Sequence, residues 1–175
     1  MTKRTLLLVG ILFLSLIGVV MAQQFSNIKA LLRGYDEVPS VSTAARGEFV
    51  ASVNPEGDSI DWRLTYADTS ANVTQAHIHF GEEHTNGGIS VWLCSNLASP
   101  PTPPGVQPCP LTGGTIDGTI VAADVVGPTG QGIAAGELAE LIAAIRAGAA
   151  YANVHTANFP PGEIRDQIAP HRGHR

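Results

Sequence analysis

A stretch of strict alternation between apolar and polar residues, 60–66, constrains the fold more than any other feature of this chain. Its apolar or aromatic positions are Ile60, Trp62, Leu64 and Tyr66, and every residue between them is polar or charged. Successive side chains of a β-strand point to opposite faces, so a period of two predicts a strand with one buried face. The chain is therefore expected to form a sheet with a core packed against one side.

The same pattern, interrupted by turn residues, predicts further strands. They are expected at 49–53, 60–66, 73–80, 89–94, 115–121, 149–156 and 163–168, with turns at 54–58, 86–88 and 159–162. Apolar residues recur at helical spacing over 138–145, and Gly148 marks the end of that helix. Several short strands with a single short helix indicate an all-β domain, a β-sandwich or barrel.

The first residues have the layout of an export signal. Lys3 and Arg4 precede the apolar run 6–20, and Val20 and Ala22 are the small residues expected before a cleavage site. The alternative is a membrane anchor, but the run is short for a span of about 20 residues and no positive charges directly follow it. We expect a cleaved signal peptide at 1–22, one domain at 23–168 and a flexible tail at 169–175. The mature protein would be secreted or periplasmic, without a stable membrane span.

Composition and motifs exclude several classes of function. The 10 Lys and Arg are outnumbered by 15 Asp and Glu, and a net charge of −5 leaves no broad basic surface for nucleic acid. No G-x-S-x-G, P-loop, G-x-G-x-x-G or H-E-x-x-H motif is present, so no catalytic residue of those classes is indicated. The partner that remains open is another exported protein.

The two cysteines of the chain, Cys94 and Cys109, flank a Pro-rich segment. Thiols pair in an oxidising compartment, so export predicts a disulfide between them. The bond would close a loop of about 15 residues and contribute about 3 kcal/mol in the chain-entropy model. A Cys-based metal site would need more thiols than these two.

Two histidines on one strand are the first candidates for chemistry. In the strand expected at 73–80, the period of two places His77 and His79 on one face together with Gln75. Their Cα atoms are then about 6.6–6.8 Å apart, close enough for both imidazoles to bind one ion at about 2.0–2.1 Å. The alternative is a pair of solvated histidines on a polar strand face.

A third histidine, His155, lies on another expected strand, and a shared sheet would let it complete a metal site with His77 and His79. Imidazole ligands suit copper or zinc among other transition metals. The side chains expected to support these ligands are Gln75, Tyr151 and Asn153. A competing arrangement replaces His155 by His84 and a loop carboxylate, but we favour the interpretation of His84 as part of a polar turn.

Two charged residues fall on one face of the last expected strand, Glu163 and Arg165. They are expected to form surface ion pairs with a neighbouring strand, which would contribute little to stability. Arg165 could alternatively anchor an anionic ligand.

Four segments follow one another along the chain as short motifs: 32–39 (LRGYDEVP), 76–79 (AHIH), 151–156 (YANVHT) and 161–168 (PGEIRDQI). Together they resemble the CHRD domain family, whose opening is L-x-G-x-x-E-V-P and whose centre is A-H-I-H. Residues 151–156 (YANVHT) and 161–168 (PGEIRDQI) are similar to its closing Y-V-N-V-H-T and P-x-G-E-I-R-G-Q. The resemblance covers about residues 25–168. It implies an extracytoplasmic β-sandwich of immunoglobulin-like type and leaves the biochemical role open.

This chain departs from the family pattern at two places. Asp166 stands where the family usually has Gly, which either adds a charge or removes a tight backbone position near the last strand. The loop between Cys94 and Cys109 resembles a local insertion, so its surface would be particular to this protein.

A second likeness concerns the histidines alone. Residues 77–81 (HIHFG) are similar to the H-V-H-x-F-G strand of the Cu/Zn superoxide dismutases, which are also β-sandwiches. That similarity implies copper ligands at His77 and His79, with His155 as a later one. The bridging histidine and the zinc site of that family are not evident, and fold analogy alone does not confer activity.

Three hypotheses follow from the sequence. The first is an exported, non-enzymatic CHRD-domain binding module with a transition-metal site at His77, His79 and His155. The second is an extracellular protein-interaction module without metal. The third is a copper-dependent redox protein of dismutase type.

Overall fold

The computed structural model describes residues 28–170, in which nine β-strands and one α-helix are present. The strands are β1 (Ile28–Arg33), β2 (Arg46–Val53), β3 (Ser59–Ala67), β4 (Val73–Phe80), β5 (Gly88–Ser95), β6 (Gly114–Val121), β7 (Ala150–Thr156), β8 (Ile164–Gln167) and β9 (Ala169–Pro170). The helix α2 covers Leu138–Ala147, and 3₁₀ turns cover Gly34–Asp36, Ala122–Asp124 and Thr129–Gln131. The expected all-β fold with one short helix is confirmed. The expected signal peptide lies outside the described residues.

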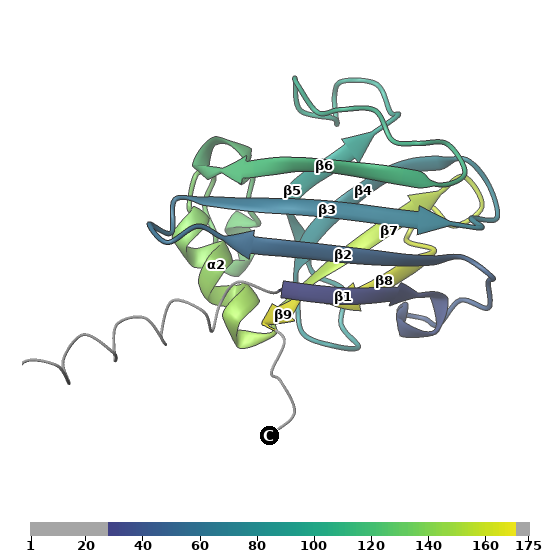
Figure 1. Ribbon diagram of the computed structural model, residues 1–175, viewed down its shortest axis with the longest axis horizontal. Helices are drawn as coiled ribbons and strands as arrows, with labels where there is room; N and C mark the ends of the chain where they lie inside the picture. Colours follow the sequence, from purple (N-terminus) through teal and green to yellow (C-terminus); the bar gives the residue numbers. More distant parts are fainter. Residues whose placement is uncertain (1–27, 171–175) are drawn as a thin grey trace, which may run out of the picture.

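All strand pairings are antiparallel, and the strands form one continuous sheet in the order β5-β4-β7-β8-β1-β2-β3-β6. Figure 1 shows this sheet folded into two layers, with β6, β3, β2 and β1 in front and β5, β4, β7 and β8 running diagonally behind. The result is a nearly closed antiparallel barrel or sandwich. Its two end strands, β5 and β6, do not pair with each other.

The alternating stretch that predicted a strand forms β3. Its apolar positions are at most 7% exposed, while the intervening Asp61, Arg63 and Thr65 face solvent. Phe49 of β2 pairs with Leu64 of β3, and both side chains are fully buried between the two layers. Burial of such side chains supplies the main favourable free energy of folding, about 25 cal/mol per Å² of apolar surface.

The helix α2 packs against β7 and β9 at one end of the two layers (Figure 1). The side chains that it buries are Leu138, Leu141, Ile142, Ala144 and Ile145, as the helical spacing predicted. Gly148 ends the helix in the left-handed conformation, with φ of 75°, and its N–H donates to the last turn. That conformation favours glycine, because a Cβ atom would be strained there.

Two strands extend the domain beyond the expected elements. β1 begins at Ile28, and β9 pairs with it through Ala169 and Pro170. These two residues were expected in the flexible tail, and that assignment is wrong because the pairing holds them in the sheet. Asp166, the departure from the family pattern, lies at the same junction. Its carboxylate accepts the backbone N–H of Leu31 at 2.7 Å, next to the single residue pair between β1 and β8.

The predicted disulfide between Cys94 and Cys109 is confirmed. It joins the end of β5 to the loop that leads to β6, and both cysteines are buried. Asn96 secures the same loop, because its amide donates to the carbonyls of Val73 and Cys109 at 2.8 and 3.1 Å. Within residues 28–170, no helix has the length and apolarity needed to cross a membrane.

Candidate metal centre

His77, His79 and His155 lie together on the outer face of the layer that contains β4 and β7. β4 and β7 are neighbours in the sheet, and their register places Gln75 opposite His155. One ring nitrogen from each histidine lies within 4.8 Å of the other two. The core-facing side of β4 carries Ala76 and Ile78, which are fully buried. The structure thus brings together the three histidines that the sequence proposed as ligands.

The three rings are buried although they lie outside the sandwich core. His77 is 1% exposed, His79 8% and His155 6%. The loops that follow β4 and β7 contact the rings, and Trp92 of β5 packs against His77. The alternative of solvated histidines on an open strand face is therefore wrong.

Two backbone carbonyls fix the orientation of two of the rings. His79 Nδ1 lies 3.0 Å from the carbonyl oxygen of Gly87, and His155 Nδ1 lies 2.9 Å from that of Pro160. Because a carbonyl oxygen only accepts, both Nδ1 atoms carry the proton and donate it. The Nε2 atoms of these two rings therefore carry a lone pair and no proton. A histidine that binds a metal through one ring nitrogen usually donates the N–H of the other ring nitrogen to such an acceptor.

The third ring, His77, completes the cluster. Its Nδ1 lies 3.1 Å from His155 Nε2, which has only a lone pair to offer, so the His77 proton lies between the two atoms. Among the described residues, Nε2 of His77 and Nε2 of His79 are buried and have no hydrogen-bond partner. Unpartnered buried nitrogens cost free energy, which makes them candidates for a ligand outside the chain.

The spacing of the ring nitrogens requires a small contraction to hold an ion. Three nitrogens at about 2.0–2.1 Å from one ion are about 3.3–3.6 Å apart. The cluster, with nitrogens within 4.8 Å, would close by about 1 Å. An ion bound at Nε2 of His155 would replace the hydrogen bond that this atom accepts from His77, while the neutral His77 ring keeps its proton.

Burial keeps the three histidines neutral. Burial, together with smaller effects of His155 and His79, lowers the pKa of His77 to about 2. Burial likewise lowers the pKa of His79 and of His155 to about 4. A metal binds the neutral imidazole, so the rings do not have to lose a proton to solvent at neutral pH.

Aromatic rings form the walls of the cluster. Trp92 meets His77 edge to face, with ring centroids 4.3 Å apart, and Tyr151 stacks on His79 at 4.8 Å. The Tyr151 hydroxyl accepts the N–H of Gly87, whose carbonyl oxygen receives the His79 proton. Tyr151 therefore supports His79 both by stacking and through the Gly87 peptide.

The other two expected supporting residues do not contact the rings through hydrogen bonds. The Asn153 amide donates to Glu37 Oε1 at 2.6 Å and to the Ile164 carbonyl at 3.0 Å. Gln75 lies beside His155 in the sheet, but within residues 28–170 its side chain makes no hydrogen bond to the cluster. Both positions border the site without holding a ligand ring.

Glu37 is a residue that sequence reasoning overlooked, although it belongs to the opening family-like motif. It is 7% exposed, and burial raises its pKa to about 7, against the opposing effects of Asn153 and Arg165. Gly162 packs against this pair, because an added Cβ would lie 2.7 Å from both Asn153 Nδ2 and Glu37 Oε1. The motif itself was the only available signal for Glu37.

The expectation of surface ion pairs at Glu163 and Arg165 is wrong, because both side chains are buried. The Glu163 carboxylate accepts hydrogen bonds from the hydroxyls of Thr43, Ser70 and Thr156 and from the Ser70 backbone. It ties two loops to the end of β7.

Arg165 has a different environment. Its guanidinium carbon lies 3.7 Å from the Tyr151 ring centroid, and it donates to the Thr85 carbonyl and the Asn86 side chain. It thus holds the loop that carries Gly87 over the cluster. His84, the competing ligand on this loop, is exposed beside Glu83 and is not part of the cluster.

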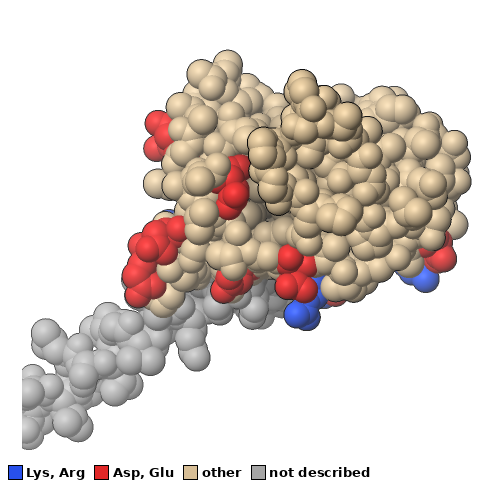
Figure 2. Space-filling view, turned by 90° about the horizontal axis from the view of Figure 1, so that it is seen from above, with Lys and Arg blue, Asp and Glu red and all other residues tan. Residues whose placement is uncertain are grey.

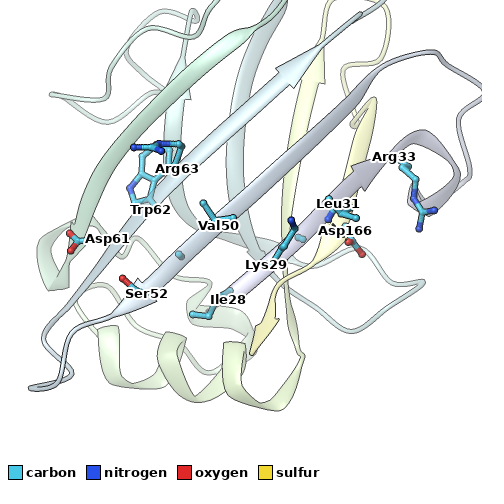
Figure 3. A pocket seen from close by; sticks show the side chains of 12 residues that line it. Ile28, Lys29, Leu31, Arg33, Val50, Ser52, Asp61, Trp62, Arg63 and Asp166 are labelled. Atoms are coloured by element: carbon cyan, nitrogen blue, oxygen red, sulfur yellow. Dashed lines mark hydrogen bonds between the residues drawn. The ribbon is translucent and has the colours of Figure 1, made fainter. Parts of the chain in front are cut away.

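A separate groove of about 800 Å³ lies on the outer face of β1, β2 and β3 (Figure 3). It is lined by side chains that include Lys29, Leu31, Val50 and Arg63. This face belongs to the front layer of Figure 1, whereas the histidines lie on the other layer. The groove therefore gives no access to the histidine cluster.

Comparison with known proteins agrees with the order of motifs along the chain. The family model described as the CHRD domain matches residues 28–168, which is nearly all of the described structure. No curated protein and no solved structure shows significant similarity to the chain. The match spans the strands that carry all three histidines, together with Glu37 and Arg165, and on this evidence the chain belongs to the CHRD domain family.

Proposed function

We propose that this protein is an exported, non-enzymatic binding module that holds one transition-metal ion, copper or zinc, through His77, His79 and His155. Export is supported by the signal-like sequence of residues 1–22 and by the disulfide between Cys94 and Cys109. The module would act outside the cytoplasm by binding the ion rather than by transforming a substrate.

One observation carries the proposal. The Gly87 and Pro160 carbonyls hold the Nδ1 protons of His79 and His155, so the Nε2 lone pair of His79 stays free and that of His155 accepts only the proton of His77. A cluster that served packing alone would have its polar atoms paired internally, yet two Nε2 atoms have no partner in the described structure. A metal ion would engage lone pairs that the protein itself leaves unused.

The test is elemental analysis of the protein purified from its native compartment without an affinity tag. We expect close to one equivalent of copper or zinc, which disappears in the double variant His77→Ala/His79→Ala. His84→Ala, which removes an exposed histidine outside the cluster, is the matched control and should keep the metal. A wild-type protein that is folded, binds no added copper or zinc and gains no thermal stability from either would refute the proposal.

A protein-interaction module is the second candidate, favoured by the gap between the end strands β5 and β6. A groove of about 420 Å³ lies there, lined by Trp92, Val106 and residues of both strands. The Gln107 amide spans it, donating to the carbonyls of Leu93 in β5 and Asp117 in β6. Figure 2 looks onto this side of the molecule, which is hollowed and mostly uncharged. Loops already bond the β5 edge at Ser90, Leu93 and Ser95, and the remaining backbone groups at this gap could pair with an extended segment of another exported protein.

A photo-crosslinking residue at Val106 tests this second candidate, with one at the exposed Glu140 of α2 as the control. A crosslink from position 106 to an extended segment of one exported protein, unaffected by chelators and missing from position 140, would support it. Equal labelling from both positions would refute it.

The copper-dependent dismutase hypothesis gains no support from the site. A redox enzyme needs an open coordination position for its small substrate, and the three rings are between 1% and 8% exposed. Activity of the copper-loaded protein above that of free copper would be needed to revive it.

A further inference from the structure

The charge of the three donor side chains limits which metal ions the cluster can hold. All three donors are imidazoles, and the hydrogen bonds of His79 and His155 Nδ1 to backbone carbonyls leave the Nε2 atoms of both rings without a proton. No carboxylate or thiolate of residues 28–170 belongs to the cluster. Glu37 directs its oxygen to Asn153, and Glu163 is surrounded by its own hydroxyl and amide donors.

The nearest fixed charge in this stack of rings is positive. Arg165 lies over the Tyr151 ring, which in turn stacks on the ring of His79. A cation in the cluster would therefore be repelled by the guanidinium of Arg165. Because the cost of burying an ion rises with the square of its charge, a divalent ion costs about four times as much as a monovalent ion of similar size.

The number of donors points in the same direction. Zn²⁺ in proteins is almost always bound by four ligands, and Cu²⁺ favours a tetragonal set of nitrogen and oxygen donors. The cluster offers three, and its rings are between 1% and 8% exposed, so a water molecule as fourth ligand would have to be buried together with the ion. A monovalent copper ion, with a filled d shell, is satisfied by three ligands.

We propose that the cluster selects Cu(I), bound by His77, His79 and His155 in a three-coordinate site, over Zn²⁺ and Cu²⁺. This inference rests on the proposed function, the metal site itself, and adds the identity and charge of the ion. Imidazole as a donor type accepts copper and zinc alike, so the selection comes from charge and coordination number. Each tenfold preference for Cu(I) over Cu²⁺ would raise the potential of the bound copper by about 59 mV.

Competition titrations of the full chain test the selection. Cu(I) is added anaerobically against a chromogenic Cu(I) chelator, and Zn²⁺ and Cu²⁺ are added against chelators matched to each ion, all at pH 7. We expect one equivalent of Cu(I), bound about 1000-fold more tightly than Zn²⁺. X-ray absorption of the Cu(I) protein should show three nitrogen ligands.

A change of ligand charge tests the physical cause. His77→Asp places a carboxylate in the cluster, so we expect the ratio of Zn²⁺ affinity to Cu(I) affinity to rise about 100-fold. His84→Asp makes the same substitution on the exposed loop and should leave the ratio unchanged. Circular dichroism establishes whether each variant is folded. If the His77 variant is unfolded, the ratio of Zn²⁺ affinity to Cu(I) affinity measured for the wild-type protein alone decides whether the site selects Cu(I).

The outcomes separate the two proposals. Histidine-dependent binding of Zn²⁺ or Cu²⁺ at least as tight as that of Cu(I) would overturn the selection and leave the metal site standing. A folded wild-type protein that binds none of the three ions would overturn both.

Discussion

Asn153 Nδ2 lies 2.6 Å from Glu37 Oε1, and both side chains are buried. This contact joins the turn after β1 to the middle of β7, between the positions of Tyr151 and His155. It also places a carboxyl group whose pKa is raised to about 7 next to the strand that carries a candidate ligand. The contact links the stability of this side of the molecule to pH.

Glu37→Gln should remove a pH dependence of the free energy of unfolding. The folded pKa of Glu37 is about 7 and its ordinary value is 4.5, so the native state keeps a proton that the unfolded state has lost between these values. Stability from this group is present below pH 4.5 and is lost as pH rises to 7, by on the order of 3 kcal/mol. Gln keeps the acceptor for Asn153 without ionising. Urea unfolding between pH 5 and 8 should show that the free energy of unfolding of the variant rises relative to that of wild type as pH rises. The exposed control Glu140→Gln should keep the pH dependence of wild type. The prediction is contradicted if the Glu37 variant keeps it too.

The metal-free protein should lose stability as pH falls below the ordinary histidine pKa of about 6.5. Unfolded histidines take up protons there, whereas burial lowers the pKa of His79 and His155 to about 4 and of His77 to about 2, so the native rings stay neutral. Each ring then lowers the free energy of unfolding by up to about 1.4 kcal/mol per pH unit as pH falls. The three rings together outweigh Glu37, whose protonation in the native state raises that free energy over the same range. Urea unfolding in chelator at pH 7 and pH 5 measures the loss, which a His84→Ala control should share. Equal stability at the two pH values would show that the rings are protonated in the native state.

Gly162→Ala should destabilise the protein by about 2 kcal/mol or more. The added Cβ would lie 2.7 Å from Asn153 Nδ2 and from Glu37 Oε1, and the φ of Gly162 is 141°. Gly130→Ala is the control, because a Cβ there meets nothing within 4 Å. Thermal unfolding of the two variants gives the comparison. A Gly162 variant as stable as the Gly130 variant would mean that the contact between Asn153 and Glu37 can move aside at little cost.

Glu163→Gln should cost about 1–3 kcal/mol despite the nearly identical shape of the side chain. The carboxylate accepts from Thr43, from Ser70 twice and from Thr156, so an amide NH₂ would face hydroxyl groups that now donate to it. Chemical denaturation measures the loss. The control is Glu137→Gln, whose native carboxylate accepts only the exposed backbone N–H of Ala134. If both variants lose equally little, the hydroxyls around Glu163 reorient freely.

Local patterns predicted the elements of the fold well, because their physical causes are local. The bounds expected for the strand with His77 and His79 are those of β4, and the helix ends at Gly148 as expected. The position of His155 beside His77 could not be predicted, since it depends on β7 pairing with β4, and strand order is set by the whole core.

The sequence did not predict that side chains on the outer face of the layer with β4 and β7 are buried. A polar strand face normally meets solvent, which led to the expectation of surface ion pairs at Glu163 and Arg165. Loops from distant parts of the chain cover this face instead, and the hydrogen bonds of Arg165 to Thr85 and Asn86 hold one of them in place. The alternation of polar and apolar residues along a strand does not predict which loops will cover that strand.

The contact of Trp92 with His77 also gives the protein an optical probe of its own. The chain has two tryptophans, and the second, Trp62, is 7% exposed and stacks with Phe49 in the core. Fluorescence emission from the indole of Trp92 would change when a metal ion binds to the His77 ring, while the emission of Trp62 would stay constant. Occupancy of the cluster could thus be followed by fluorescence in the unlabelled protein.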